Sequence, residues 1–370
     1  MRRPFVILLS TLVTIAIVEA GARVYFHAFL KRHLATLQEH MEAPPAVRSA
    51  PYYTPQFVSE QNEVRLVGRD RGYFILADAT GEYINVEGGL RRTTNQPAVP
   101  DRRILLFGGS TIQSDQVPDD ETIPSHLQHL INEQCSASVA VFNYGVGSMD
   151  LRQLAVRLRD TSIAPGDLVV FYSGVNTIYY PLYSGGWFSG PPASRPLLEA
   201  VLDRAAPFSA AAMVVADVRA RAAPRTIADA GRLQRGLDRV ERQYRTEVLT
   251  AHRFAADRGA GFVNFLQPQL FATPLSTDER HALARNYLST PAGLDVAYRE
   301  GYPRLRRALA AAAHEGVESH DISTILASDE VPAEVFLDFA HINHTGNALV
   351  ANAMFARLAG HIGNCTSPDM

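Results

Sequence analysis

The sequence contains almost no lysine: Lys31 is the only one among 370 residues, and arginine carries nearly all of the positive charge. No dense run of basic residues follows the N-terminus, and the formal net charge is −3. Nucleic-acid-binding proteins usually carry a basic patch or tail, so this composition argues against that class. We interpret the bias toward arginine as a sign of a GC-rich bacterial genome.

Cysteine is also scarce, with Cys135 and Cys365 the only two. Two thiolates cannot complete the four ligands of a structural zinc site, so they do not predict a metal centre. Two interpretations remain open. The cysteines are unrelated thiols, or they form one disulfide that ties the C-terminal tail to the rest of the chain.

Charge is absent from residues 4–18, which follow Arg2 and Arg3. This pattern is typical of an export signal or a membrane anchor, although the stretch is short for a span of about 20 residues. We favour an uncleaved anchor over residues 1–29; the alternative is a signal peptide cleaved near residues 20–22. Because Arg2 and Arg3 stay on the cytoplasmic side, the body is predicted to lie in the periplasm, anchored in the inner membrane, or to be secreted after cleavage.

Regions of different composition follow along the chain. Residues 30–62 are polar and contain four prolines, which predicts a linker without regular structure. Residues 63–100 show alternating apolar side chains between glycines, which predicts a small β extension. Residues 101–361 form the main domain, and residues 362–370 form a tail.

Short apolar runs alternate with helical patterns through the main domain. The expected strands cover residues 103–107, 139–142, 168–172, 261–266 and 319–326. The expected helices cover residues 123–134, 151–159, 225–258, 276–314 and 348–358. Such an alternation predicts an α/β fold with a parallel sheet covered by helices on both faces.

Ser110 follows the first expected strand, at the end of the sequence Phe-Gly-Gly-Ser. Parallel strands place their carboxyl ends at one rim of the sheet, and ligands bind there. A serine at that rim, where a helix begins, has backbone N–H groups beside it that suit an oxyanion. The alternative is that Ser110 only caps the helix.

Polar residues also follow the second and third expected strands. Residues 143–148 form a glycine-rich turn that ends in Ser148, and residues 174–176 read Gly-Val-Asn. The backbone N–H of Ser148 and the side chain of Asn176 are donors that cannot act as bases, so both suit an oxyanion hole. A turn or cap role is the alternative for Asn176.

The sequence Asp-Phe-Ala-His occupies residues 338–341, near the C-terminus. A serine hydroxyl needs a base to take its proton, and the base needs an orienting partner. Asp338 lies three residues before His341, close enough to reach its Nδ1 atom, so His341 is preferred over His344 as the base. The predicted catalytic set is therefore Ser110, Asp338 and His341.

These four blocks together resemble the SGNH (GDSL-like) hydrolase family, and the resemblance covers about residues 101–361. It implies a flavodoxin-like three-layer αβα sandwich with a parallel sheet, to which this chain adds an N-terminal membrane helix and a small β extension. It also implies serine-dependent esterase, lipase, deacetylase or acyltransferase activity without a metal or other cofactor. The β extension is similar to that of membrane-anchored bacterial members.

The chain departs from the family pattern at three positions. Gly109 stands where the namesake motif has aspartate, Ser148 stands where glycine is usual, and Thr177 stands where aspartate is usual. A backbone N–H remains at Ser148, but a turn built for glycine resists a side chain. Thr177 would still serve to cap the next helix.

We therefore predict a serine-dependent ester hydrolase, an acylesterase or deacetylase, that acts on O-acylated envelope carbohydrate or a small acylated molecule. The rings of Tyr179, Tyr180 and Trp187 would stack on a sugar or line an acyl pocket; the alternative is that they cover the core. Two other functions remain open: an O-acyltransferase, and a catalytically weak binding or assembly component of a polysaccharide system. The expected partners are the substrate and the membrane, and nucleic acid is not expected.

Overall fold

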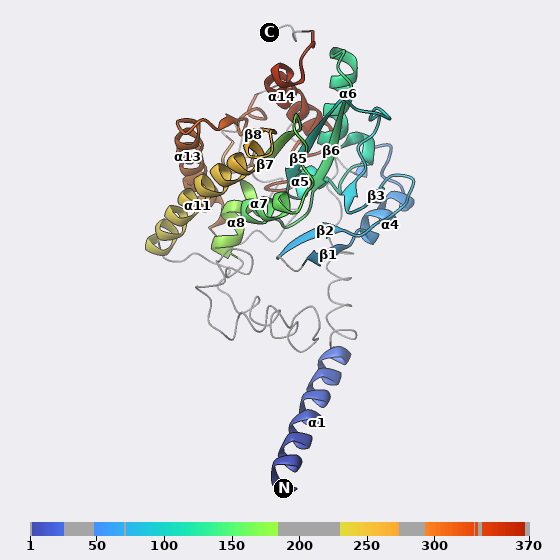
Figure 1. Cartoon of the computed structure of the whole chain (residues 1–370), viewed down its shortest axis with the longest axis vertical. Helices are drawn as coiled ribbons and strands as arrows, with labels where there is room; N and C mark the ends of the chain where they lie inside the picture. The colour runs from blue at the N-terminus through green and yellow to red at the C-terminus, as the bar shows by residue number, and fades with distance from the viewer. Residues whose placement is uncertain are drawn as a thin grey trace.

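A mostly parallel sheet forms the centre of the computed structural model (Figure 1). The structure describes residues 2–25, 48–69, 72–183, 230–273, 293–328, 330–331 and 335–366. The parallel strands are β5 (Arg102–Gly108), β6 (Val139–Gly145), β7 (Leu168–Ser173), β8 (Gly261–Leu266) and β9 (Glu318–Asp321). They lie in the order β6-β5-β7-β8-β9, which is the flavodoxin-like arrangement.

The strands are apolar because helices cover the sheet on both faces. All six residues of β7 are buried, and β5 is buried from Ile104 to its end. A strand hidden on both sides has no solvent face, so its sequence reads as a continuous apolar run rather than an alternation. This is why continuous apolar runs in the sequence predict the central strands.

Two helices, α6 (Ile123–Gln134) and α14 (His344–Ile362), pack against each other on one face of the sheet. On the other face α11 (Ala230–Ala256) packs against α7 (Leu151–Arg159), α13 (Leu294–Ala313) and α8 (Val175–Tyr183). The buried side of α11 carries apolar residues every three or four positions, as a surface helix requires. These residues are Leu233, Leu237, Val240, Tyr244, Val248, Ala251 and Ala255.

The predicted β extension consists of two hairpins. β1 (Leu66–Arg69) pairs with β2 (Tyr73–Leu76) in a separate sheet. β3 (Val86–Glu87) and β4 (Leu90–Arg91) instead join the edge of the main sheet, where Arg91 lies opposite Asn143 of β6. The second hairpin thereby reaches the edge of the main sheet near the carboxyl end of β6.

The chain differs from prediction before this extension, because α4 (Pro55–Glu63) is helical where an irregular linker was expected. Thr54 caps the helix by accepting a hydrogen bond from the N–H of Phe57 at 3.2 Å. Pro55 occupies the first turn, where no N–H donor is needed and its fixed φ favours a helix. Pro55 therefore begins a helix and does not prevent regular structure here.

The last strand is shorter than the predicted residues 319–326. β9 ends at Asp321, because its side chain accepts a hydrogen bond from the N–H of Ser323 at 2.9 Å and turns the chain. The predicted helices are found as α6, α7, α11, α13 and α14, but residues 225–229 and 276–292 lie outside the described residues.

Residues near the N-terminus form the helix α1 (Arg2–Tyr25). The sequence predicted a membrane helix here, yet within the described residues no helix combines the length and apolar character needed to cross a bilayer. Glu19 and Arg23 interrupt the apolar sequence of α1 and pair with each other at 3.1 Å. The membrane-helix part of the predicted fold is therefore not supported.

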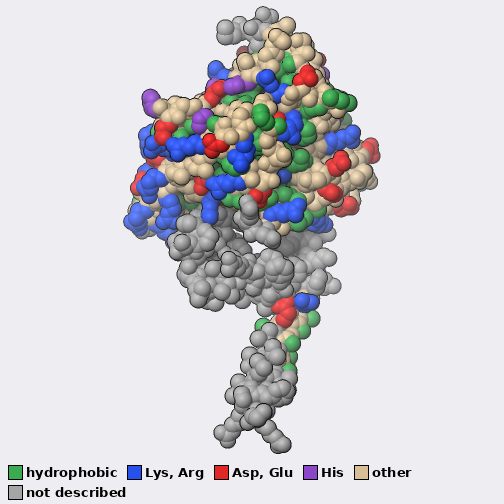
Figure 2. Space-filling view, in the orientation of Figure 1, with side chains coloured by type: hydrophobic (Ala, Val, Ile, Leu, Met, Phe, Trp, Pro, Cys, Tyr) green, Lys and Arg blue, Asp and Glu red, His purple; other side chains and the backbone are tan. Residues whose placement is uncertain are grey.

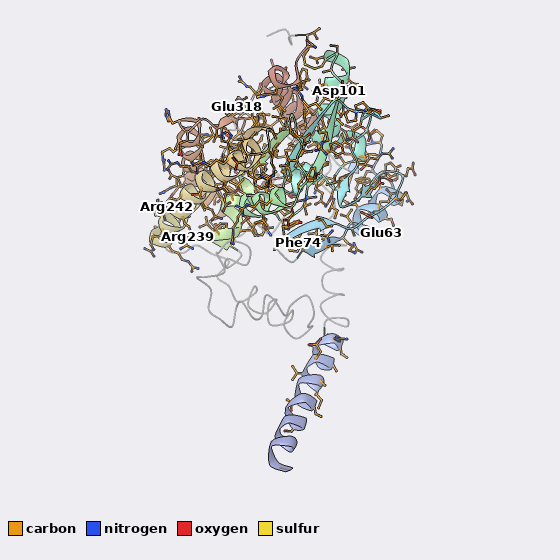
Figure 3. The ribbon with its side chains drawn as sticks, viewed as in Figure 1. Glu63, Phe74, Asp101, Arg239, Arg242 and Glu318 are labelled. Atoms are coloured by element: carbon orange, nitrogen blue, oxygen red, sulfur yellow. A yellow bond between two sulfur atoms is a disulfide. The ribbon has the colours of Figure 1, made fainter. Side chains whose placement is uncertain are left out.

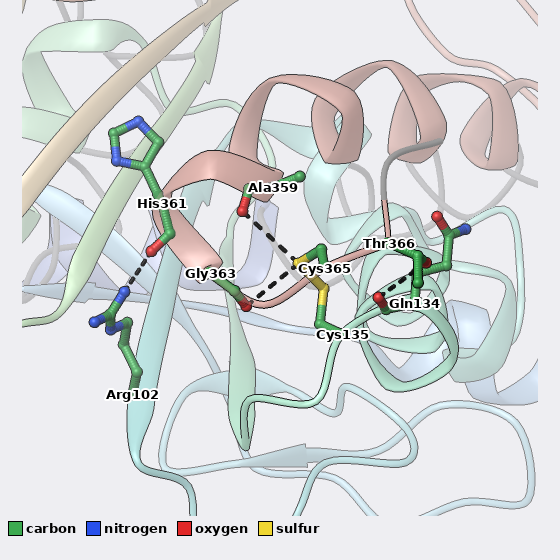
Figure 4. The surroundings of a disulfide bond; sticks show 8 residues. All are labelled: Arg102, Gln134, Cys135, Ala359, His361, Gly363, Cys365 and Thr366. Atoms are coloured by element: carbon green, nitrogen blue, oxygen red, sulfur yellow. Dashed lines mark hydrogen bonds between the residues drawn. A yellow bond between two sulfur atoms is a disulfide. The ribbon is translucent and has the colours of Figure 1, made fainter. Parts of the chain in front are cut away.

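The two cysteines form a disulfide, which decides between the two interpretations left open by the sequence (Figure 4). Cys135 follows α6 and Cys365 follows α14, so the bond joins the carboxyl ends of the paired helices. At the opposite ends the Asn347 side chain donates to the Glu121 carbonyl at 2.9 Å. The pair of helices is thus fastened at both ends, and α14 begins at His344, three residues after His341.

We expect the Cys135→Ser and Cys365→Ser variants to lose about 2–4 kcal/mol of unfolding free energy, because the bond closes a long loop in the unfolded chain. Urea unfolding followed by circular dichroism measures this loss. A reductant should destabilise the wild-type protein by a similar amount and leave the double variant unchanged. Equal stability of oxidised and reduced wild-type protein would contradict the expectation.

Candidate active site

Ser110 begins the short helix α5 (Ser110–Gln113), directly after β5 at the carboxyl rim of the sheet. The strand order reverses beside β5, and such switch points are where open α/β sheets bind ligands. A Cβ atom on Gly109 would lie 2.8 Å from Asn176 Nδ2, so a side chain there would push this amide away. Glycine at position 109 therefore lets the amide approach the backbone of the nucleophile turn.

The structure brings Ser110, His341 and Asp338 into one hydrogen-bonded chain. The His341 Nε2 atom lies 2.7 Å from Ser110 Oγ, although 231 positions separate them in the sequence. The His341 Nδ1 atom lies 2.6 Å from Asp338 Oδ2. An Nδ1–H that donates to Asp338 leaves Nε2 unprotonated, so it can accept the serine proton.

Asp338 is fixed by its own backbone turn. Its Oδ1 atom accepts hydrogen bonds from the N–H groups of Ala340, at 2.6 Å, and His341, at 2.7 Å. The carbonyl of Phe339 in turn accepts from the Gln269 side chain, at 3.0 Å, and from the Leu270 N–H, at 3.2 Å. Residues that follow β8 therefore hold the turn that carries the Asp338 carboxylate and the His341 imidazole.

Burial and pairing act in opposite directions on the pKa values of this pair. Burial alone would raise the pKa of Asp338, but attraction to His341 and the hydrogen bonds it accepts outweigh burial and lower it. Burial would lower the pKa of His341, but attraction and hydrogen bonding to Asp338, with a further attraction to Asp115, raise it above 6.5. The imidazolium form that arises during proton transfer is thereby stabilised.

Two possible oxyanion donors lie at the nucleophile turn, and the sequence predicts a third. The N–H of Ser110 stands at the start of α5, where the helix itself offers no acceptor. The Asn176 Nδ2 atom donates one hydrogen to the Met149 carbonyl at 2.8 Å, which leaves its second hydrogen for the site. The N–H of Ser148 is the third donor predicted from the sequence.

Ser148 adopts a left-handed backbone with φ of 64°, the conformation that explains why glycine is usual there. The departure from the family pattern therefore keeps the turn and adds a hydroxyl. That hydroxyl is hydrogen-bonded to Tyr180, whose pKa is raised to about 12, mainly by burial. Thr177 differs from expectation, because it lies buried inside α8 and does not cap it.

Gln113 and Asp115 belong to the site but were missed by sequence reasoning. The Gln113 side chain accepts a hydrogen bond from the Gly147 N–H and donates one to Asp115. Gly147 directly precedes Ser148, so Gln113 holds the turn that carries the third oxyanion donor. The only signal in the sequence was the spacing of Gln113, one helical turn after Ser110.

Arg91 of β4 is a second missed residue, and it is almost fully buried beneath the nucleophile loop. It pairs with Asp119, Nε to Oδ1, at 3.0 Å. It also donates to the carbonyls of Gln113, at 2.7 Å, of Ser114, and of Val117, at 2.6 Å. A guanidinium satisfies all these acceptors at once because its donors are planar and divergent. The β extension is thus joined by these hydrogen bonds to the loop that follows Ser110.

Of the three predicted aromatic residues, Tyr179 and Tyr180 lie on α8 and Trp187 lies outside the described residues. The Tyr179 ring stacks on Phe339, at 5.9 Å between centroids, and on Tyr183, at 5.7 Å. Tyr179 therefore supports the loop between Asp338 and His341, which is a packing role at the site's border.

His344 is not part of the hydrogen-bonded set. It begins α14, and its ring meets the edge of Tyr52 at 6.1 Å. Within the described residues, no group of three histidine, cysteine or acidic side chains is arranged to hold a metal ion.

Comparisons with known proteins give distant structural likenesses only. No protein-family model matches the chain, and no curated protein matches its sequence. Among solved structures, LAE5, an α/β hydrolase enzyme from the metagenome of Lake Arreo, Spain, is 14% identical, with a TM-score of 0.41 over 73% of this chain and 98% of that one. A variant of Axe2, an acetyl xylan esterase from Geobacillus stearothermophilus, is 13% identical, with a TM-score of 0.41 and the same coverage, 73% and 98%.

A GDSL-like lipase from Bacteroides thetaiotaomicron is 10% identical, with a TM-score of 0.39 over 68% of this chain and 85% of that one. Likenesses this remote do not establish a family. The chemistry of the present chain therefore rests on the geometry of its own site.

The pH dependence of kcat/KM should report the His341 base, which reacts only when neutral. Because the pKa of His341 is raised, activity should increase with pH along a limb whose midpoint lies above 6.5. Asp338→Asn removes the main attraction that raises this pKa, so the limb should move to lower pH, and kcat should fall by up to about 10⁴. A limb at or below 6.5 in the wild-type protein, or one that Asp338→Asn leaves in place, would contradict this assignment.

Proposed function

We propose that this protein is a serine-dependent ester hydrolase, an acylesterase or deacetylase. The observation that carries the proposal is the chain of contacts from Asp338 through His341 to Ser110, at 2.6 and 2.7 Å. Its orientation leaves an imidazole nitrogen aimed at a serine hydroxyl, beside backbone and amide donors. A serine placed only to cap a helix needs no such base.

In the first half of the reaction, His341 Nε2 takes the Ser110 proton as Oγ attacks the ester carbonyl carbon. The carbonyl oxygen becomes an oxyanion and is stabilised by the N–H groups of Ser110 and Ser148 and by the Asn176 amide. His341 then returns its proton to the departing alcohol oxygen as the carbon–oxygen bond breaks. An acyl-serine and a free alcohol result.

In the second half, water takes the place of the alcohol. His341 removes one water proton as the oxygen attacks the acyl carbon, and then gives that proton to Ser110 Oγ as the acyl–serine bond breaks. A carboxylic acid leaves, and the enzyme returns to its starting state. A sugar hydroxyl in place of water would make the same site an O-acyltransferase, which product analysis with an acceptor sugar distinguishes.

The proposed substrate is an O-acylated carbohydrate of the cell envelope. One feature supports this proposal: the hydroxyls of Ser148 and Tyr180, which are hydrogen-bonded to each other, lie beside the predicted oxyanion donors. Polar groups next to the reacting ester suit a substrate that carries hydroxyl groups of its own.

We further propose that the protein acts outside the cytoplasm. The disulfide between Cys135 and Cys365 supports this location, because disulfides persist in oxidising compartments and are rare in the bacterial cytosol. The uncharged residues 4–18 after Arg2 and Arg3 are typical of an export segment.

In intact bacteria that express the full chain, both cysteines should resist maleimide labelling until a reductant is added. External protease should digest the protein in spheroplasts, in which a cytosolic marker enzyme survives. Free thiols on a protein that is protected from protease would place it in the cytoplasm and refute the location.

Ser110 should react with a fluorophosphonate probe, because only a serine activated by a base attacks phosphorus at a useful rate. We expect Ser110→Ala to abolish both labelling and hydrolysis of p-nitrophenyl acetate, and Asn176→Ala to lower kcat by about 10²–10³. Ser162→Ala and Asn352→Ala, at exposed positions, are matched controls that should retain full activity. A wild-type protein that takes no label would favour the catalytically weak binding component instead.

A further inference from the structure

An arginine stripe runs along the outer side of α11, opposite its buried residues. We give this name to Arg232, Arg235, Arg239 and Arg242, which recur every three or four positions and are all exposed. This spacing places the four side chains on one face, over about 15 Å of helix. Figure 3 labels Arg239 and Arg242 at the edge of the molecule, and Figure 2 shows basic side chains gathered over this part of the surface.

Two acidic residues of α11 lie among the stripe arginines in the sequence, and neither neutralises the stripe, because both pair with arginines of α13. Asp238 pairs with Arg304, and Glu241 pairs with Arg307 at 2.8 Å. Within the described residues, no carboxylate forms an ion pair with any member of the arginine stripe. Like charges three or four positions apart destabilise a helix, so an anionic ligand bound along the unneutralised stripe would relieve this repulsion.

The groove between α11 and α13 is a weaker candidate for a binding site. It has a volume of about 560 Å³, and its walls include Glu241, Arg245, Arg307 and Glu315. These charges already pair across the groove, Arg245 with Glu315 and Arg307 with Glu241. An ion that entered the groove would have to break such pairs. An anion that binds the arginine stripe on the outer side of α11 would not have to break an ion pair of the described residues.

The stripe begins near the catalytic rim. α11 leads into the parallel strand β8 and therefore runs back along the sheet, with its first residues toward the carboxyl ends of the strands. A contact with α8 agrees with this direction, since a Cβ atom on Gly236 would lie 2.4 Å from the Leu182 side chain. α8 also carries Asn176 and Tyr180, so a long ligand on the stripe extends toward Ser110.

We propose that the arginine stripe docks an anionic carbohydrate polymer, whose O-acyl groups are the substrate of the catalytic serine. The inference rests on the proposed esterase function and adds the charge of the substrate. Guanidinium groups bind carboxylates through paired, planar hydrogen bonds. Repeated carboxylates along a polymer match a repeated row of arginines, and binding along α11 supplies a polymer segment to the rim.

Binding is measured first on the full chain with Ser110→Ala, which cannot turn substrate over. The probes are polygalacturonate and, as the neutral polymer, dextran of similar size. We expect polygalacturonate to bind and dextran not to bind at low ionic strength, and salt at about 1 M to abolish binding by screening. Failure of polygalacturonate to bind, or equal binding of both polymers, would overturn the inference.

The matched control removes the same number of arginines at another place on the surface. Replacing Arg235, Arg239 and Arg242 together by glutamine should weaken polygalacturonate binding about tenfold, as expected for three exposed charge contacts. Replacing Arg65, Arg92 and Arg357 by glutamine changes the net charge equally at exposed positions away from α11 and should change binding less than twofold. An equal loss in both triple variants would show nonspecific attraction and refute the stripe.

Kinetics with the active protein separate this inference from the esterase proposal. On O-acetylated polygalacturonate, the stripe variant should raise KM about tenfold and leave kcat unchanged, while its turnover of p-nitrophenyl acetate stays at the wild-type level. If wild-type protein binds the polymer but hydrolyses neither ester, the esterase proposal fails and the docking surface stands. If vesicles containing phosphatidylglycerol bind more tightly than the polymer and the stripe variant abolishes that binding, the surface is a membrane contact and the inference fails.

Discussion

The hydrogen bond between Ser110 Oγ and His341 Nε2 is the contact on which the rest of the active site depends. It joins two segments 231 positions apart, at 2.7 Å, so small movements of either segment would break it. The fold holds both segments independently. β5 and α5 position the serine, while the turn after β8 and the beginning of α14 position the histidine.

Two devices outside the catalytic residues stabilise this meeting. The disulfide and the Asn347–Glu121 hydrogen bond fasten α14 to α6 and its preceding turn, and so fix where the histidine loop ends. Buried Arg91 fastens the β extension to three carbonyls beyond Ser110. Removing a buried cation would leave its acceptors and Asp119 unpaired, which is costly. The extension therefore acts on the site through its packing.

The positions that depart from the family pattern show how a sequence change can be absorbed. Ser148 takes the backbone conformation for which glycine is usual, keeps its N–H, and gains a hydroxyl partner in Tyr180. Gly109 acts through the side chain that it lacks. Its absence leaves room for the Asn176 amide to approach the backbone next to Ser110. Both positions therefore change what surrounds Ser110 and leave its contact with His341 in place.

The sequence by itself determined the parallel αβ core, since strands buried on both faces read as apolar runs and surface helices repeat every three to four residues. Spacing also identified Asp338 and His341 as a pair, because a carboxylate three residues away can reach the same ring. Only the tertiary structure decided that Cys135 bonds Cys365, that Arg91 lies under the nucleophile loop, and that Gln113 holds Gly147. These contacts join separate elements of the chain, and no local pattern records which distant partner a side chain will meet once the sheet and helices have packed.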